Sequence, residues 1–419
     1  MADKIRIGLS LSLTSAYAPM GRQAEAALSL FVSDTNSASG IRTGRELRAI
    51  ELHCLDDASN PERCAEIYRS LCGENRVDVL FSPYSSGLTR VAALIAERAG
   101  TLFVNHGGAD DDIFSHHHKL IVGVLSPASD YFNGFVRLVA GLKLWRKRIA
   151  IVRSASGFAE AIANGIERES NERYARRKGV RIRVKFAGKF DPQSTPAKLF
   201  PALRRNRVNA LVSAGSYQHD LAVMRAVTQS PLNIPVLGCV AAGVEKFRID
   251  LGEDAEGLVG PSQWEDQLQF KPEIGPTPRE FIRSMRAHFP TVTCDYPAAQ
   301  VYAAGLLTKA AIENADSLNA VKIRAAFSDL RTTTFFGDFS IDRVTGRQIG
   351  HRMLLVQWHG GQKVVIDPEA HVETGTLEFP TGWQLLLASF QRFKLTRRDT
   401  DDDHDGEQNE DEQDRKSVV

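Results

Sequence analysis

The stretch IRIGLSLSLTSAYAPMGRQAEAALSLFVSDT, residues 5–35, indicates the class of fold. Ile5–Leu11 is a short apolar run of the kind that forms a buried strand. Gly21–Thr35 then carries apolar side chains at helical spacing on one face, among them Leu28 and Phe31. A buried strand followed directly by an amphipathic helix is the first half of a βαβ unit. The stretch therefore predicts an α/β fold built on a parallel sheet.

The same alternation of strand and helix continues along the chain in two series. The first series ends near Asn105 and the second starts near Pro127, and helical patterns return between residues 277 and 330 before a hairpin-like pair. The expected strands are Ile5–Leu11, Leu47–Asp56, Val77–Ser82, Leu102–Asn105, Arg148–Arg153, Arg181–Phe190, Ala210–Ser213 and Pro235–Gly238, with a final pair Phe336–Ile341 and His351–Trp358. This order predicts two doubly wound parallel-sheet lobes joined by multiple hinge crossovers.

The lobe boundaries are expected where the two series meet and where the late elements return. Lobe 1 is predicted at residues 4–125 plus 263–335, and lobe 2 at residues 126–262 plus 336–367. Residues 368–398 are expected to form an extension with a short apolar helix. Residues 399–419 are expected to be a disordered tail, because ten of them between Asp399 and Asp414 are acidic.

Composition and charge are those of a soluble globular protein. The chain has 52 Lys and Arg against 51 Asp and Glu, a net charge of +1, and 43% hydrophobic residues. No whole-chain field favours nucleic acid, and no apolar run approaches the ~20 residues that span a bilayer. The first residues enter a strand pattern without an apolar leader. We expect no nucleic-acid partner, no direct membrane insertion and a cytoplasmic location, which becomes periplasmic if an export signal has been removed or the start is misassigned.

Three clusters contain metal-ligand residue types. Asp110–Asp112 and His116–His118 lie in one polar stretch without cysteine or a Glu–His helical spacing, which indicates a solvated loop. Asp401–Glu412 matches the EF-hand pattern. However, Gln408 takes the place of an apolar residue, and only seven residues follow, too few for an exit helix. We expect no metal and no cofactor.

Neither thiol chemistry nor catalysis is indicated. The five cysteines include no CxxC, so we expect free thiols, with a bridge from Cys54 to Cys64 or Cys72 as the alternative. The chain has no GxSxG, no P-loop lysine, no HExxH and no GxGxxG after the first strand. We therefore expect a protein that is not an enzyme.

Ligands of open α/β sheets bind beyond the carboxyl ends of the strands, so the loops there carry the candidate site. Ser85 and Ser86 open a helix, where hydroxyls and free N–H groups suit a carboxylate or an amide; the alternative is a simple N-cap. Gly107 and Gly108 either bring the backbone close to a ligand or permit a tight turn. Tyr217 either closes over a ligand or is a half-buried core residue.

Four segments resemble a known family: IRIGLSLSLTSAYAPMGRQAEAALSLFVSDTNSASGI, LDDASNPERCAEIYRSL, SPYSSGLTRVAALIAERAG and LVSAGSYQHDLAVMRAV. Over roughly Lys4–Asp367 they are similar to the leucine/isoleucine/valine-binding branch of the type I periplasmic-binding fold. The resemblance implies a solute-binding protein of an ABC transporter that closes on a small amino-acid-like, amide or carboxylate ligand, with permease subunits as partners. The alternatives are a cytoplasmic amide-sensing regulator with a regulatory protein partner, and an enzyme that uses the cleft.

The resemblance and the loops together assign the ligand contacts. In the family, the ligand carboxylate is held by the Ser-Ser turn and the loop after the fourth strand, and aromatic residues come from both lobes. The contacts assigned are Tyr17, Ser85, Ser86, Gly107, Gly108, Ala109, Phe158 and Tyr217.

Two departures from the family pattern concern the ligand ammonium. Ala109 stands where the family's amino-acid binders have a hydroxyl, and the loop 238–243 has no carboxylate before Glu245. An ammonium left unpaired in a closed cleft costs several kcal/mol. We therefore expect an amide, a urea-like compound or a simple carboxylate, unless a different register brings Glu245 or Glu265 into the cleft.

Overall fold

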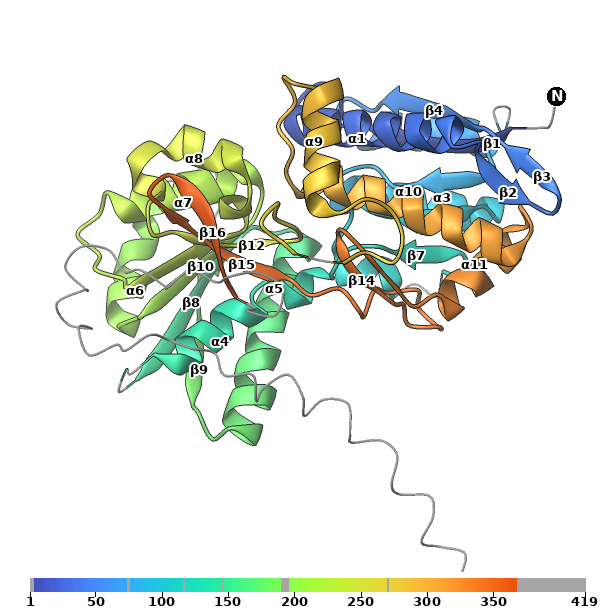
Figure 1. The fold of residues 1–419 in the computed structure, drawn as a ribbon. Coiled ribbons are helices and arrows are strands. Elements are labelled where there is room, and N and C mark those ends of the chain that lie inside the picture. The colour runs from blue at the N-terminus through green and yellow to red at the C-terminus, as the bar shows by residue number, and fades with distance from the viewer. Residues whose placement is uncertain are drawn as a thin grey trace, which may run out of the picture.

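A computed structural model describes residues 4–367 apart from 74–75, 116–117, 143, 145, 190–195 and 270. The chain forms two α/β lobes that lie side by side, which confirms the predicted fold class (Figure 1). Within these ranges, no helix is both long and apolar enough to cross a membrane. The predicted extension at 368–398, the acidic tail at 399–419 and its EF-hand pattern lie outside the described residues.

Lobe 1 is built on an all-parallel sheet of five strands in the order β4-β1-β5-β6-β7. The chain runs from β1 to β4 on one side and then to β5, β6 and β7 on the other, so a topological switch point lies between β1 and β5. The strands are β1 (Ile5–Leu11), β4 (Ile50–Asp56), β5 (Val79–Phe81), β6 (Leu102–Asn105) and β7 (Ile121–Gly123).

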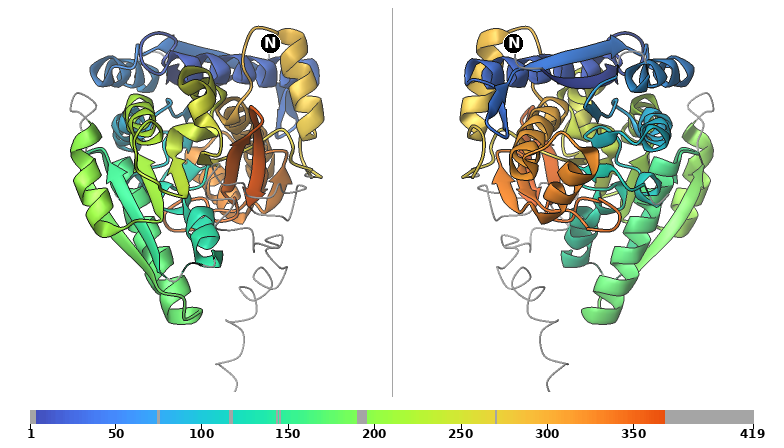
Figure 2. Two further views of the ribbon diagram at one scale, coloured as in Figure 1. Left: turned by 90° about the vertical axis from the view of Figure 1, so that its left-hand side faces the viewer. Right: turned by 90° about the vertical axis from the view of Figure 1, so that its right-hand side faces the viewer.

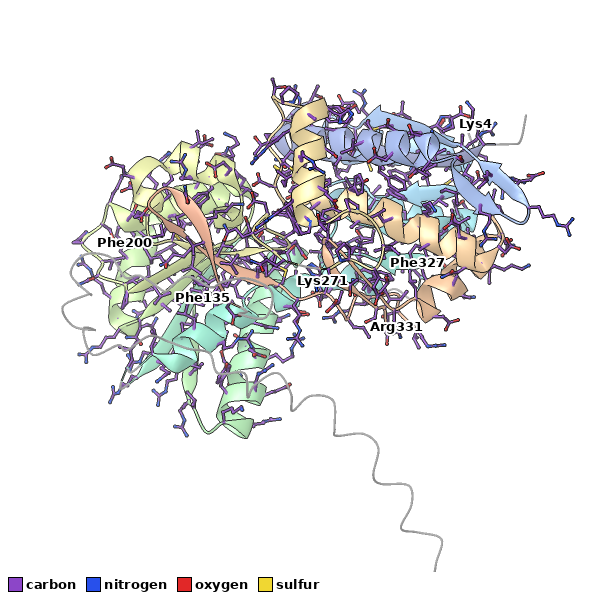
Figure 3. The ribbon with its side chains drawn as sticks, in the orientation of Figure 1. Lys4, Phe135, Phe200, Lys271, Phe327 and Arg331 are labelled. Carbon is purple, nitrogen blue, oxygen red and sulfur yellow. The ribbon has the colours of Figure 1, made fainter. Side chains whose placement is uncertain are left out.

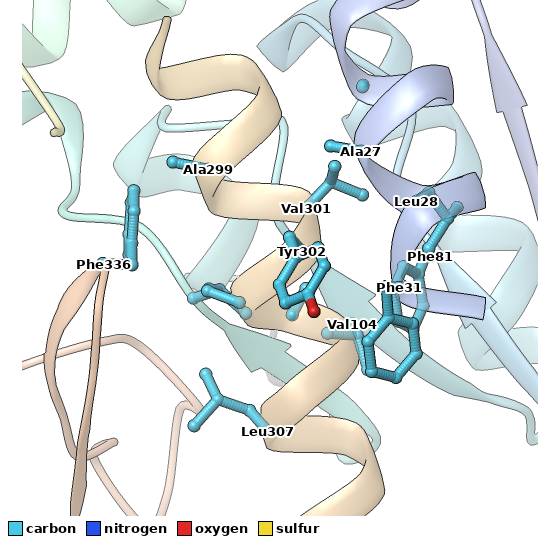
Figure 4. Close-up of a cluster of buried hydrophobic side chains, with 14 of the residues drawn as sticks. Ala27, Leu28, Phe31, Phe81, Val104, Ala299, Val301, Tyr302, Leu307 and Phe336 are labelled. Atoms are coloured by element: carbon cyan, nitrogen blue, oxygen red, sulfur yellow. The ribbon is translucent and has the colours of Figure 1, made fainter. Parts of the chain in front are cut away.

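Helices cover both faces of this sheet because its strands are apolar on both sides. The helices are α1 (Ala18–Ser37), α2 (Pro61–Cys72), α3 (Ser86–Ala99), α9 (Pro278–His288), α10 (Tyr296–Ala315) and α11 (Ala320–Asp329). On one face α1 packs against α10, where Phe31 meets Tyr302 edge to face with 5.7 Å between ring centroids (Figure 4). A Cβ at Gly305 would lie 2.5 Å from the Phe31 ring, so glycine allows this close approach.

Lobe 2 repeats the same winding. Its sheet has the order β16-β15-β12-β11-β10-β8-β9, in which β8 to β12 are parallel and the switch point lies between β8 and β10. β15 and β16, which come from the end of the described chain, are antiparallel additions at one edge (Figure 2). The strands are β8 (Lys147–Arg153), β9 (Ile182–Lys189), β10 (Ala210–Ala214), β11 (Val236–Cys239), β12 (Val259–Ser262), β15 (Leu354–His359) and β16 (Gln362–Asp367).

Alternate residues of β8 point into two separate cores, as a strand buried on both faces requires. Ile149 and Ile151 pack with α4 and α5, whereas Ala150 and Val152 pack with α6, α7 and α8. Phe135 of α4 is fully buried in the first of these cores (Figure 3). The helices are α4 (Asn133–Gly141), α5 (Gly157–Arg168), α6 (Phe200–Asn206), α7 (Tyr217–Thr228) and α8 (Glu245–Leu251).

The predicted pairing of Phe336–Ile341 with His351–Trp358 is wrong. β14 (Gly337–Phe339) pairs instead with β13 (Thr332–Thr334), and β15 pairs with β12 and β16. The turn between the two predicted strands does form, because Asp342 Oδ1 accepts backbone N–H bonds two and three residues ahead. The chain then crosses to the other lobe, where β15 pairs with β12 over more residues than β14 pairs with β13.

Within the described residues, the chain crosses between the lobes three times, and a polar network links these crossovers to one another. Ser126 follows β7, Gln263 follows β12 and His351 precedes β15. Ser126 N–H donates to Gln263 Oε1 and Gln263 Nε2 donates to the Ser126 carbonyl, both at 3.0 Å. Ser126 Oγ lies 2.7 Å from His351 Nδ1. This network is the hinge of the molecule.

The predicted residue limits of the two lobes stay a prediction. The packing of buried side chains is informative for one limit, at residue 336. Phe339 meets Phe327 of the lobe 1 helix α11 edge to face, with 6.0 Å between ring centroids. This packing favours assigning the segment 336–341, which the sequence placed in lobe 2, to lobe 1.

The stability of the protein should depend on pH through His351. Its ring stacks on Phe336 with 4.4 Å between centroids, and burial lowers its pKa to about 4, well below the ordinary histidine value of 6.5. Between about pH 6.5 and pH 4, the unfolded chain binds a proton that the folded chain does not. The free energy of unfolding should therefore fall by up to ~1.4 kcal/mol per pH unit as the pH drops through this window, measured by urea unfolding.

The His351→Gln variant isolates this contribution. Burial also lowers the pKa of His106, to about 3, and this residue contributes a slope of the same sign in both proteins. The variant curve should therefore be flatter than the native curve between pH 6.5 and pH 4. Two parallel curves would contradict the assignment to His351.

Candidate functional site

A cavity of about 310 Å³ lies between the lobes, at the carboxyl ends of both sheets. Lobe 1 contributes the segments after β1, β5 and β6 and residues of α10, and lobe 2 contributes the segments after β8, β10 and β11. The predicted residues that line it are Tyr17, Ser85, Ser86, Gly107, Ala109, Phe158 and Tyr217. Gly108 is not among the lining residues. Contact of these residues with a ligand stays a prediction.

Ser85 is the N-cap of α3, as its simpler interpretation predicted. Its Oγ accepts a hydrogen bond from the Leu88 N–H at 3.4 Å. Its backbone has φ 103° and ψ 143°, a region that residues with a side chain rarely adopt. The strain lies at the cavity wall, in the loop that directs the first turn of α3 toward the cavity.

Ser86 and Gly87 present hydrogen-bond donors to the cavity. Ser86 Oγ accepts the N–H groups of Ala109 and Asp110, each at 3.1 Å, so the hydroxyl proton is left to donate. The backbone N–H groups of Ser86 and Gly87 have no acceptor within the described ranges. Three donors at the positive end of a helix suit a carboxylate or an amide carbonyl.

The two predicted glycines serve the packing of loops. A Cβ at Gly107 would lie 2.0 Å from the Pro83 carbonyl oxygen, and the Gly107 carbonyl accepts the Ser85 N–H at 3.3 Å. A Cβ at Gly108 would lie 2.6 Å from the Thr89 side chain, behind the cavity wall. Both glycines therefore hold the loop after β6 against the start of α3.

Six aromatic rings form much of the apolar wall. They are Tyr17, Tyr84, Tyr131, Phe158, Tyr217 and Tyr296. Tyr17 meets Tyr84 edge to face at 6.1 Å, and the hydroxyls of Tyr84 and Tyr296 lie 2.9 Å apart. Burial raises the pKa of Tyr84 to about 12, so its phenol is neutral at neutral pH. The sequence predicted three of the six rings. Tyr131 and Tyr296 were missed because they lie outside the loops considered, and Tyr84 was missed although it lies in the loop after β5.

Tyr217 combines features of both its predicted roles. Its ring lines the cavity, but its hydroxyl donates to Asp250 Oδ2 at 2.6 Å and so is turned toward α8 instead of water. Burial and the Asp250 carboxylate both raise the pKa of Tyr217. The side chain is therefore held in place before a ligand arrives.

Asp220 is a lining carboxylate that the sequence analysis did not predict. It lies in the first turn of α7 and is fully buried. Oδ1 accepts a bond from Ser213 Oγ at 2.8 Å and lies 3.2 Å from His219 Nδ1, and Oδ2 accepts the Ala241 N–H at 3.0 Å. A buried polar side chain one turn after the helix-capping Ser216 was the available signal.

The two carboxylates that a different register could have placed in the cleft lie elsewhere. Glu245 pairs with Arg248 at 3.1 Å, and Glu265 pairs with Lys363 at 3.0 Å. Neither residue lines the cavity. Among the lining residues of the described chain, Asp220 is thus the one with a carboxylic side chain.

Residues 4–363 match the family model described as periplasmic binding protein. The chain belongs to this family. The match covers both lobes, the hinge and every segment that lines the cavity. The two windings with ligand loops at facing sheet ends are therefore those of a periplasmic binding protein.

Solved structures of the same fold include transport proteins with different ligands. The branched-chain amino acid transporter substrate-binding protein LivJ of Streptococcus pneumoniae, in complex with isoleucine, is 18% identical with a TM-score of 0.70, over 87% of this chain and 100% of that one. The leucine-binding protein LivK of Thermotoga maritima is 17% identical with a TM-score of 0.72, over 86% and 97%. An ABC-transporter solute-binding protein of R. palustris, in complex with benzoate, is 18% identical with a TM-score of 0.70, over 90% and 99%.

Charged contacts bridge the two lobes of this periplasmic binding protein beside the cavity. Lys363 of β16 donates to Glu265 Oε1 at 3.0 Å and to Asp295 Oδ1 at 3.1 Å, and Asp295 directly precedes α10 of lobe 1. Burial acts to lower the pKa of Lys363, but the two carboxylates outweigh burial and the pKa is raised. At the start of α5, a Cβ at Gly157 would lie 2.6 Å from Asp110 Oδ2 of lobe 1. The lobes are therefore in contact around the cavity.

The expectation of a solvated loop at Asp110–Asp112 and His116–His118 is wrong for Asp110 and His118, which are both buried. The Asp110 carboxylate pairs with Arg90 and caps the following 3₁₀ turn. The aspartate is buried because this segment lies between α3 and α5, where its charge has a partner. No metal-binding group of three His, Cys, Asp or Glu occurs in the part of the chain that the structure describes, and His116 and His117 lie outside it. All five cysteines are free, so the Cys54 bridge does not form.

Ser86→Ala should lower the free energy of unfolding of the ligand-free protein by about 1–3 kcal/mol. The reason is that the N–H groups of Ala109 and Asp110 lose their common acceptor. Ser33→Ala, at an exposed position of α1, is the matched control and should change stability little. Urea unfolding measures both variants, and equal values for the two would refute the structural role of Ser86.

Proposed function

We propose that this chain is the ligand-capturing component of an ABC uptake system and that it performs no chemistry on its ligand. The ligand is a small carboxylate or neutral amide that carries no ammonium group. The observation that carries the proposal is the set of donors at the start of α3, where Ser86 and Gly87 offer two N–H groups and one O–H to an interlobe cavity. Hinge closure about Ser126 would enclose the ligand between the lobes.

The character of the cavity supports a ligand that is anionic or polar at one end and apolar elsewhere. Six rings line it, and no lysine, arginine or glutamate does so among the described lining residues. A carboxylate would then be held by helix N–H groups without a cationic side chain. The benzoate-bound relative of the same fold carries a ligand of this kind.

Asp220 bears directly on whether the ligand has an ammonium. Two protein donors, Ser213 Oγ and the Ala241 N–H, already bond its carboxylate, and His219 Nδ1 lies 3.2 Å from Oδ1, so most of its hydrogen-bonding capacity is in use before a ligand binds. An ammonium would have to share oxygens that Ser213 and Ala241 occupy. This arrangement disfavours a zwitterionic amino acid.

Binding of an α-amino acid is the second candidate function, and it too depends on Asp220. A carboxylate has about four acceptor sites; Ser213 and Ala241 use two and His219 Nδ1 lies beside a third, so at least one is left for an ammonium. The isoleucine-bound relative supports this candidate. In either case the proposed partners are permease subunits, with a periplasmic location; a cytoplasmic ligand-sensing regulator with a regulatory protein partner is the alternative.

Calorimetric titration with leucine, 4-methylpentanoate and 4-methylpentanamide separates the two candidates. We expect the acid or the amide to bind at least about tenfold more tightly than leucine, because leucine adds an ammonium that the cavity pairs poorly. Asp220→Asn should leave binding of the acid within about threefold, with the exposed Asp266→Asn as control. Micromolar leucine binding that Asp220→Asn abolishes would establish the amino-acid function instead.

A further inference from the structure

The amino ends of three neighbouring strands of lobe 2 gather basic residues. β10, β8 and β9 are adjacent and parallel, so their amino ends lie together at the edge of the sheet opposite the cavity. The segments 142–148, 176–183 and 204–209 contain these ends and carry 12 Lys and Arg but no Asp or Glu, although the whole chain has a net charge of only +1. We call the surface formed by these three segments the basic pole.

The arginines of the basic pole are exposed and have no carboxylate partner. Those with exposed side chains are Arg146, Arg176, Arg181, Arg183, Arg204, Arg205 and Arg207. Within the described ranges none of them forms an ion pair. Elsewhere in lobe 2 the arginines are paired, for example Arg153 with Glu160 and Arg173 with Glu169. Because like charges that lie close together repel one another, the basic pole favours a partner with many negative charges.

Protection of an edge strand explains only part of this charge. β9 lies at the edge of its sheet, and Lys and Arg on such strands prevent pairing with another chain. This accounts for Arg183 and Lys185 of β9, but not for Arg204 and Arg205 of α6 or for Arg146 before β8. No large hydrophobic side chain is exposed in the described part of the pole. Charge, rather than burial of apolar surface, must therefore drive binding there.

We propose that the acidic segment 401–414 of the same chain binds the basic pole. Nine of its 14 residues are Asp or Glu, and none is Lys or Arg. A carboxylate accepts two parallel N–H bonds from one guanidinium, so a surface rich in arginine suits a partner rich in carboxylates. No residue of the basic pole lines the cavity, so this proposal goes beyond the proposed function and does not depend on the ligand.

The covalent connection favours this contact within one chain. The described residues end at Asp367, whose carboxylate pairs with Arg137 of α4 in lobe 2. Residues 368–400 follow, and about 33 residues span at most ~120 Å. A domain of about 150 residues has a radius of gyration of only about 15 Å, so the acidic segment can reach every face of lobe 2. A tethered partner acts at an effective concentration on the order of millimolar, so individually weak contacts suffice.

Zero-length cross-linking of the full chain with a carbodiimide tests the proposal, because this reagent joins only carboxylates and amines that are in contact. At low salt, mass spectrometry of the monomer should find the acidic segment joined to Lys147, Lys178 or Lys185, which lie at or beside the basic pole. The exposed Lys119 and Lys322 of lobe 1 are the controls and should not be joined to it. The links should be lost at ~1 M salt, where the Debye length falls to about 3 Å.

Two sets of four substitutions test the side chains of the basic pole. The first set removes exposed arginines of the pole, at Arg181→Gln, Arg183→Gln, Arg204→Gln and Arg205→Gln. It should abolish the links between the acidic segment and the pole lysines. The matched control set removes the same charge from exposed positions of lobe 1, at Arg45→Gln, Arg63→Gln, Arg69→Gln and Arg98→Gln. It should leave the links unchanged. Thermal melting checks that both variants fold, and the test on the native chain requires neither.

Several outcomes would overturn the proposal. Links spread evenly over the lysines of both lobes would show that the acidic segment has no specific site. Links found only in a covalent dimer would assign the basic pole to the acidic segment of a second copy. If no link forms at low salt, the proposal is wrong, and binding of the native chain to phosphatidylglycerol vesicles or to duplex DNA would then identify an external partner. None of these results affects the ligand proposed for the cavity, which the calorimetric titrations test separately.

Discussion

The hydrogen bonds among Ser126, Gln263 and His351 are the constraint on which the rest of the structure depends. Gln263 satisfies both the N–H and the carbonyl of Ser126, as a neighbouring strand would do in a sheet. The crossovers thereby cross a buried region without unpaired backbone groups. A rotation at this point would leave both sheets intact and change the gap between their carboxyl ends, where every predicted contact residue except Gly108 lines the cavity.

Beside the cavity, charged side chains fix how the lobes meet. Lys363 joins Glu265 and Asp295 in a group with almost no access to water. Buried ion pairs lose much of their Coulomb attraction to desolvation, so such a group specifies geometry more than it adds stability. Asp295 immediately precedes Tyr296, and Gln300 follows one turn later. The contact between the lobes is therefore continuous with the part of the cavity wall that α10 forms.

Local sequence patterns predicted the long helices and strands well, because helix and strand periodicity depend on residues that are close in sequence. They failed where structure depends on distant partners: β12, with sequence VGPS, contains glycine and proline and is a strand only because β11 and β15 flank it. The residues that line the cavity also divide into those predicted from local sequence and those that depend on distant packing. Ser85, Ser86 and Gly107 follow strands and were predicted, whereas Asp220 and Gln300 lie on helices, and only the packing of α7 and α10 turns them toward the cavity.

The cavity wall of lobe 1 carries donors that a ligand could satisfy. The two free N–H groups at the start of α3 lack partners in the described chain. These groups are fixed by α3, whereas the aromatic cover from Phe158 and Tyr217 belongs to lobe 2. Under the proposed function, a ligand bound to these donors would complete its contacts only when lobe 2 closes over it. Affinity and closure would then be one equilibrium, since the ligand would gain its full contacts in the closed state alone.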